Sequence, residues 1–148
     1  MSAREAALRL HVLRSQAQLV LATANRAAAP STHLMAYAHS DDLRHVFLAS
    51  GRTRKLADML ENPAVSLLWD NRTGNLADHA DGILVTARGR ATELTGGDAA
   101  RARAALLHRN PNMSGFLGGE SVAMVDVEVE TMAVVVGYGS PELFTPSL

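Results

Sequence analysis

Segments with the residue pattern of β-strands run through most of the chain, and they constrain its fold more than any other feature. The clearest covers residues 124–129, where apolar residues alternate with Asp126 and Glu128, so that one face is apolar and the other acidic. Apolar and β-branched runs between turn residues predict the other strands. The predicted strands cover residues 18–24, 31–39, 44–49, 64–70, 83–94, 122–128 and 131–138.

Helices are few in comparison. We predict them at residues 3–15, at residues 53–60, and in an alanine-rich segment that follows a capping-box-like sequence at Thr95–Asp98 and ends at His108. A Rossmann sheet would need a helix after nearly every strand, and no G-x-G-x-x-G follows the first strand. The pattern therefore predicts a mainly β fold, an antiparallel barrel with flanking helices, in a single domain over residues 1–148.

Charge and composition narrow the class of partners. The 148 residues carry a formal net charge of -1, with 47% hydrophobic and 20% charged residues, as in soluble globular proteins. There is no general positive charge for nucleic acid and no apolar run of roughly 20 residues for a membrane helix, so neither partner is expected. The chain has no cysteine, which excludes disulfides and thiolate nucleophiles within it and is consistent with a cytoplasmic protein.

One short segment carries the chemistry of an anion site. Thr53, Arg54 and Lys55 stand where a loop enters a predicted helix, and Arg52 and Ser50 precede them. Free backbone N–H groups and the helix dipole favour an anion there, while the hydroxyl and basic side chains add donors and positive charge. A phosphomonoester is the natural ligand. The alternative interpretation is a solvated basic helix start without a ligand.

The surrounding residues resemble a known family. After the Thr53-Arg54-Lys55 triplet come Glu61-Asn62-Pro63 and then Val65-Ser66-Leu67-Leu68, in the order found in the flavin-phosphate segment of pyridoxamine-phosphate-oxidase-like split barrels. The order of predicted strands and helices matches that family over residues 1–138. The resemblance implies a split barrel of six to seven antiparallel strands that binds flavin mononucleotide (FMN).

The resemblance also implies roles for individual residues. Thr53, Arg54 and Lys55 would bind the FMN phosphate, and Ser50 supplies a further hydroxyl close to it. The other expected cofactor contacts are Leu48 and Ala49 along the ring and ribityl chain, the strand of His33, Leu34, Met35 and Ala36 along the isoalloxazine edge, and Asn71 in the loop after the fourth strand. The family often has Thr at the position of Ala49, and the oxidase itself has Arg at the position of His33. Asn71 would reach a cofactor across a subunit interface, or it belongs to a loop outside the barrel.

The family implies a homodimer with a cofactor site at the subunit interface and an FMN-dependent oxidoreductase acting on a small molecule. Residues 139–148 lack the Trp and Arg that hold substrate phosphate in the oxidases proper, so oxidation of pyridoxamine phosphate is not expected. No residue stands out as a catalytic acid or base, since the flavin itself would supply the redox chemistry. The open alternatives are a deazaflavin-binding or heme-binding split barrel, a flavin binder without enzymatic activity, and a scaffold without a cofactor.

Overall fold

The computed structural model describes residues 10–74 and 78–146. A helix at residues 10–15 opens the described chain, and the first seven residues of the predicted helix at 3–15 lie outside it. The elements that follow are β1 (Gln18–Ala24), β2 (Pro30–Ala36), β3 (Ala38–His39), β4 (His45–Ser50), α2 (Arg54–Glu61), β5 (Ala64–Asp70), α3 (Asp78–Asp81), β6 (Ile83–Leu94), α4 (Gly96–Arg109), a 3₁₀ turn (Pro111–Met113), α5 (Ser114–Leu117), β7 (Ala123–Val136) and β8 (Glu142–Phe144). Within these ranges no helix is long and apolar enough to cross a lipid bilayer.

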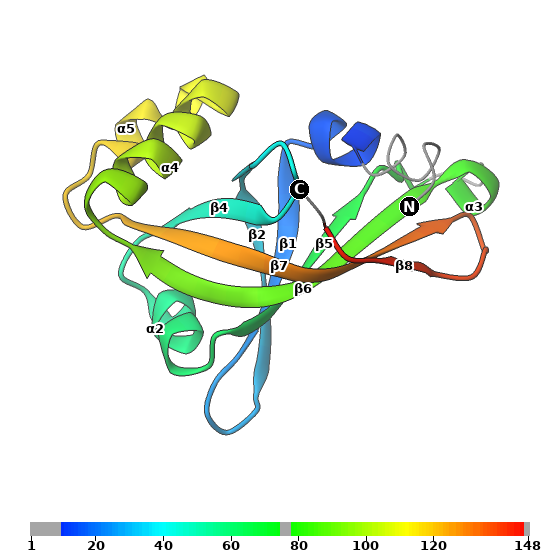
Figure 1. Ribbon diagram of the computed structural model, residues 1–148, viewed down its shortest axis with the longest axis horizontal. Coiled ribbons are helices and arrows are strands. Elements are labelled where there is room, and N and C mark those ends of the chain that lie inside the picture. The colour runs from blue at the N-terminus through cyan, green and yellow to red at the C-terminus, as the bar shows by residue number, and fades with distance from the viewer. Residues whose placement is uncertain (1–9, 75–77, 147–148) are drawn as a thin grey trace.

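The strands form one antiparallel sheet that curls into a barrel (Figure 1). Hydrogen-bonded neighbours follow the order β2-β1-β5-β6-β7-β4-β3, and β8 adds to β7. Only Tyr37 separates β2 from β3. Because β2 pairs with β1 while β3 pairs with β4, the segment from Pro30 to His39 joins the two edges of the sheet. The predicted mainly β fold, an antiparallel barrel with flanking helices, is therefore confirmed.

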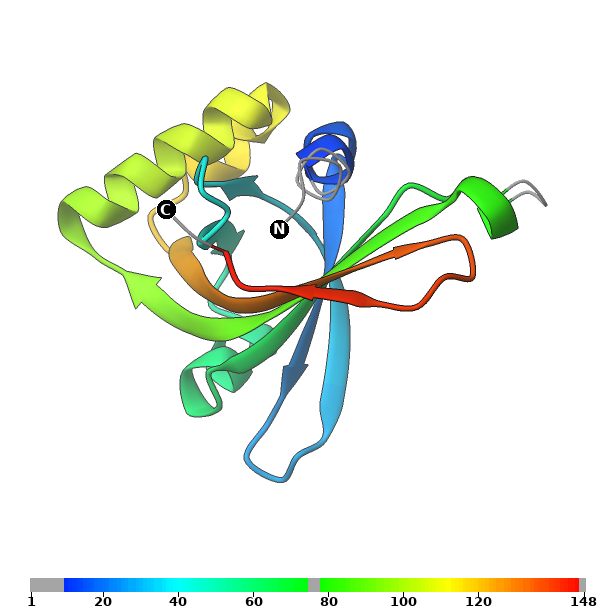
Figure 2. The same ribbon diagram turned by 45° about the vertical axis from the view of Figure 1, so that its right-hand side comes forward.

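Two helices close the ends of the barrel. Leu56 and Met59 of α2 belong to the same apolar core as Leu13 of the helix at residues 10–15. Figures 1 and 2 show these helices at opposite ends of the barrel. Between them the strands fill the interior with inward-facing side chains, of which Trp69 is the largest. Its ring meets that of Tyr37 edge to face at 5.8 Å, so the two rings lock β5 to the bend that closes the sheet.

The third helix, α4, packs on the outer face of the barrel, over β3, β4 and β7. Its residues Ala102 and Leu106 belong with Ala49 of β4 to a second apolar cluster. At the end of α4, the Arg109 guanidinium donates to the Leu13 carbonyl at 2.8 Å, which satisfies an orphan carbonyl of the N-terminal helix. The helix outside the barrel and the helix at its end are thus held together.

The structure corrects the prediction of two final strands. Residues 123–136 form a single strand, β7, whose register against β6 shifts where Gly89 pairs with Val129 and Arg88 with Thr131. Glu130 is the extra residue of this β-bulge. The buried positions are odd-numbered from Val125 to Val129 and even-numbered at Met132 and Val134. In the sequence, this shift of the buried positions looks like a break between two strands, although residues 123–136 form one continuous strand.

Replacing Gly89 with Ala is expected to destabilise the fold by about 2 kcal/mol or more, because a side chain does not fit beside the bulge. A Cβ at this position would lie 2.3 Å from the backbone oxygen of Glu128, which cannot swing away as a side-chain end would. The check is the free energy of unfolding in urea. Gly115→Ala in α5 is the control, because nothing lies within 4 Å of its added methyl group, and we expect it to leave stability unchanged or slightly raised. Equal stability of the two variants would contradict the expectation.

Three smaller differences also separate the expected elements from the structure. The segment at 71–81, expected to be a loop, ends in the short helix α3, and β8 was not predicted at all. Thr95 is the N-cap residue of α4, but its side chain makes no capping hydrogen bond, so the capping box is not formed. Each of these features depends on contacts that the local sequence pattern does not encode.

Candidate cofactor site

The triplet Thr53-Arg54-Lys55 lies where β4 turns into α2. The Thr53 N–H donates to the Gly51 carbonyl at 2.8 Å, which makes the turn tight. Thr53 is the N-cap residue of α2, yet its hydroxyl makes no capping hydrogen bond, and the first turn holds no acidic residue. The amide groups and the positive dipole end of this eight-residue helix are therefore available to an anion.

Two of the three nearby cations are available to the same anion. Lys55 is half-buried, and its side chain has no hydrogen bond or ion pair with any residue that the structure describes. The Arg54 side chain is 74% exposed, and its Nε lies 3.2 Å from Asp58 Oδ1, within ion-pair distance but without hydrogen-bond geometry. Arg52, in contrast, donates two hydrogen bonds to Glu93 of β6, at 3.1 and 2.8 Å. These bonds lower the pKa of Glu93 and hold Arg52 away from the helix start.

β2 and β4 are not paired with each other, and the split that this leaves in the barrel lies beside the strand that precedes α2. β3 pairs with β4 only at Val46 and Phe47, so the rest of β4 pairs with β7 alone. β2 pairs with β1 alone, and it lies close to β4 without strand pairing between them. The facing edges of residues 33–36 and 48–50 thus carry backbone groups without a strand partner. Unpaired strand edges are ready donors and acceptors for whatever lies along them.

The side chains on the β4 edge point away from this split. Leu48 is fully buried in the barrel core, and Ala49 is covered by the cluster under α4. Ser50 is also buried, and its hydroxyl donates to the Gly51 carbonyl at 2.8 Å. These three residues can therefore meet a ligand chiefly through their backbone, and the Ser50 hydroxyl is already engaged.

Of residues 33–36 in β2, one has an exposed side chain. Leu34 is 69% exposed, whereas Met35 is buried in the core and Ala36 is half-buried. His33 is half-buried too, and its Nε2 is buried without a hydrogen-bond partner among the described residues. The structure thus brings residues 33–36 to the split, with Leu34 pointing outward.

Asn71 lies far from the triplet within one chain. It directly follows the last residue of β5, whereas α2 precedes the first residue of that strand. The seven residues of β5 extend about 20 Å and separate the two ends. Its backbone N–H donates to the Ile83 carbonyl, and its side-chain Oδ1 accepts from the Ile83 N–H at 2.8 Å. Asn71 therefore closes the turn into β6 and is not brought together with Thr53.

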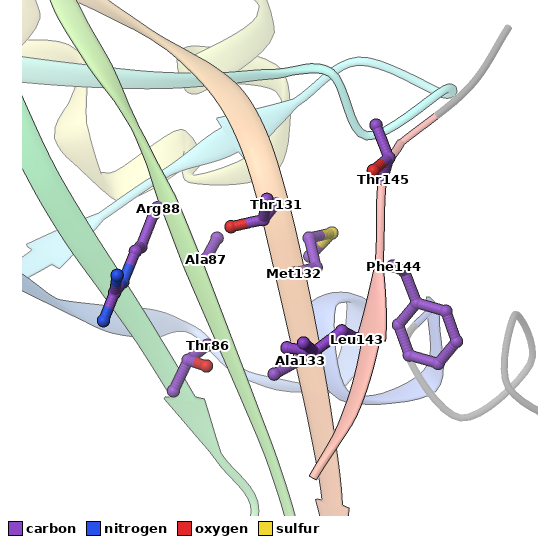
Figure 3. Close-up of a pocket in the computed structure, with 9 residues that line it drawn as sticks. All are labelled: Thr86, Ala87, Arg88, Thr131, Met132, Ala133, Leu143, Phe144 and Thr145. Carbon is purple, nitrogen blue, oxygen red and sulfur yellow. The ribbon is translucent and has the colours of Figure 1, made fainter.

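A row of side chains crosses the outer face of the sheet, from β2 to β8. Strand register places its six members side by side: Leu34, Val20, Leu68, Thr86, Ala133 and Leu143. The β6, β7 and β8 members of this outer row help to line a hollow of about 670 Å³. Figure 3 shows the residues that line it. The two ends of the row are the most exposed, at 69% for Leu34 and 79% for Leu143. Exposed apolar residues gathered on one face are typical of an interaction surface.

Comparison with families of known proteins matches residues 10–115, more than two thirds of the chain, to pyridoxamine 5'-phosphate oxidase. The chain belongs to this family. The predicted family resemblance is thus confirmed, and the matched residues include the whole segment from β1 to α4 that forms the split and the triplet. No curated protein matches the sequence.

Solved structures agree with the split-barrel fold of this oxidase-like family. The heme binding protein from Mycobacterium smegmatis matches with a TM-score of 0.83 and 21% identity over 99% of this chain and 59% of that one. The chain therefore spans about three fifths of that protein. HutZ, the heme storage protein from Vibrio cholerae, matches with a TM-score of 0.72 and 16% identity over 86% and 92% of the two chains. General Stress Protein 26 from Bacillus anthracis matches with a TM-score of 0.68 and 17% identity over 94% and 96%. At these identities the likeness shows the fold alone.

Sequence reasoning missed one residue that shapes the site. Glu93 holds Arg52 in two hydrogen bonds, but 41 positions separate the two residues. No local pattern connects them, because the contact depends on β6 lying beside the loop after β4.

Proposed function

We propose that this protein binds FMN at the split between β2 and β4 and acts as an FMN-dependent oxidoreductase on a small molecule. The observation that carries the proposal is the helix start, where the Thr53 hydroxyl makes no capping bond and Lys55 has no partner in the described part of the chain. A phosphate dianion would supply both with hydrogen bonds. Membership of the pyridoxamine 5'-phosphate oxidase family supports FMN as the source of that phosphate.

One group of residues in this chain would bind the FMN phosphate, and a second group would orient the ring system. Arg54 and Lys55 neutralise the phosphate, while the Thr53 hydroxyl and the first amides of α2 donate to its oxygens. The unpaired backbone edges of residues 33–36 and 48–50 fix the ring system by hydrogen bonds along the split. FMN, when bound, supplies the electron or hydride transfer itself.

Two other cofactors remain as second candidates. Heme is supported by the two similar structures described as a heme binding protein and a heme storage protein. A deazaflavin cofactor carries a phosphate as well, so the triplet would serve it equally. His33 Nε2 is buried, so this imidazole would have to rotate outward before it could ligate a heme iron.

The test is reconstitution with FMN and with hemin in parallel, followed by mixing with NADH. We expect one FMN to bind per chain and its flavin absorbance to bleach faster than that of free FMN, with recovery in air. Saturable hemin binding without FMN binding would replace this proposal with the heme alternative. FMN binding without accelerated bleaching would leave a flavin binder and exclude NADH-linked oxidoreductase activity.

We also propose a homodimer that pairs through the outer row defined above. A Leu34→Asp variant is then expected to raise the dimer dissociation constant by about 100-fold or more, since an unpaired carboxylate would be buried at the interface. Analytical ultracentrifugation at several concentrations measures this constant. Leu107→Asp, on the exposed side of α4, is the matched control and should leave it unchanged. A wild-type protein that sediments as a monomer at micromolar concentration would refute the proposed dimer.

A further inference from the structure

A second hollow lies away from the split, between the beginning of β4 and α4. Its volume is about 400 Å³, and it is lined by His45, Phe47, Leu94, Asp98, Arg101, Ala102 and Asp126. None of its lining residues belongs to the triplet or to the strand edges at residues 33–36 and 48–50, so this hollow is distinct from the proposed FMN site. The proposed cofactor function makes no use of it.

His45 and Asp126 form a dyad in this hollow. The His45 Nδ1 lies 3.1 and 2.9 Å from the two oxygens of Asp126, in the geometry of a shared N–H donor. With the proton on Nδ1, the neutral ring carries its free electron pair on Nε2, which has no hydrogen-bond partner among the described residues. The dyad therefore keeps an acceptor of fixed orientation.

The Asp126 carboxylate has spare accepting capacity. Its side chain is only 16% exposed, and its two oxygens share the single His45 donor, although a carboxylate can accept about four hydrogen bonds. Burial raises the pKa of Asp126, which reflects this incomplete solvation. A ligand with N–H donors would supply what is missing.

The walls of the hollow select for a flat, apolar body. The rings of His45 and Phe47 are nearly parallel, at 4° with their centroids 6.4 Å apart, and Leu94 and Ala102 add aliphatic surface. The only permanent cation of the lining, Arg101, is paired with Asp98 on the same helix. Asp126 is thus the one charge of the lining without a permanent counter-ion, and the hollow favours a cation.

We propose that the hollow between β4 and α4 binds a small aromatic cation of the arylamidine or arylamine class. A nitrogen of the ligand donates to the Asp126 carboxylate, and its ring packs against Phe47. Charge-assisted hydrogen bonds of this kind are about twice as strong as neutral ones, and aromatic packing adds to them.

Benzamidine is the probe for this site, titrated into the whole 148-residue chain and followed by NMR of the His45 ring nitrogens. We expect saturable shifts of both nitrogens at millimolar benzamidine, and binding about 10-fold weaker or worse for the Asp126→Asn variant. Glu128→Gln, on the same strand but exposed to solvent, is the matched control and should bind as the wild type does.

Neutral benzamide provides a second measurement on the unaltered protein, so the test does not depend on the folding of a variant. It should bind about 10-fold more weakly than benzamidine, because it lacks the charge. An absence of saturable shifts, equal binding of benzamide and benzamidine, or unchanged binding by the folded Asp126→Asn variant would each overturn the proposal.

Discussion

Replacing Arg54 and Lys55 together with Ala is expected to weaken FMN binding by about 100-fold or more. Each side chain would make a charge-assisted hydrogen bond to the phosphate, worth about 1.5 kcal/mol at this exposed position, and the sum of about 3 kcal/mol corresponds to that factor. The dissociation constant is measured by quenching of flavin fluorescence. Stability is measured separately, because Arg54 also lies 3.2 Å from the buried Asp58 carboxylate, and its removal leaves that charge without a cation.

Arg52→Ala is the matched control for this double variant. Arg52 is two residues away from Arg54, but Glu93 holds it by two hydrogen bonds. We expect the control to keep FMN affinity within about threefold, since a screened surface charge contributes little. If the control loses as much affinity as the double variant, the effect is one of general positive charge, and the assigned phosphate contacts are wrong.

Trp69→Ala is the substitution with the largest expected effect on stability. The side chain is fully buried at the centre of the barrel and meets Tyr37 edge to face, so its removal leaves a cavity that the surrounding strands cannot fill. Such truncations cost about 3–5 kcal/mol, a large share of the stability of a domain of this size. Chemical denaturation followed by circular dichroism measures the loss.

Phe116→Ala serves as the aromatic control for Trp69→Ala. Phe116 is 47% exposed in the short helix α5, so the expected change lies within about 1 kcal/mol. A Trp69→Ala variant as stable as the Phe116→Ala variant would show that the interior of the barrel is not packed as described.

Most of the fold follows from local patterns. The strands β1, β4, β5 and β6 begin and end within a residue of their predicted limits, because turn residues bound runs whose apolar positions repeat with a fixed period. α2 is predicted for the same reason, since Asn62 and Pro63 end it. The bulge in β7 is not predictable in this way, because the phase of the pattern changes at Glu130 without any turn residue.

The candidate site is only partly predictable from sequence. Thr53, Arg54 and Lys55 are consecutive, and their hydroxyl and basic groups are those that bind a phosphate, so the residue pattern alone is enough to find them. The split between β2 and β4 arises from which strand edges remain unpaired, and this depends on the closure of the barrel at Tyr37. The dyad of His45 and Asp126 joins residues 81 positions apart, and an alternating strand pattern predicts Asp126 as one more solvated acid.

The proposed FMN site places the flavin phosphate at the start of α2. The most direct measurement is a comparison of FMN with riboflavin, which carries the same ring and ribityl chain but no phosphate, by titration calorimetry on the wild-type protein. We expect FMN to bind about 100-fold more tightly than riboflavin, since the phosphate contacts at Thr53, Arg54 and Lys55 supply the difference. Equal affinity for the two compounds, or no binding of either, would contradict the account.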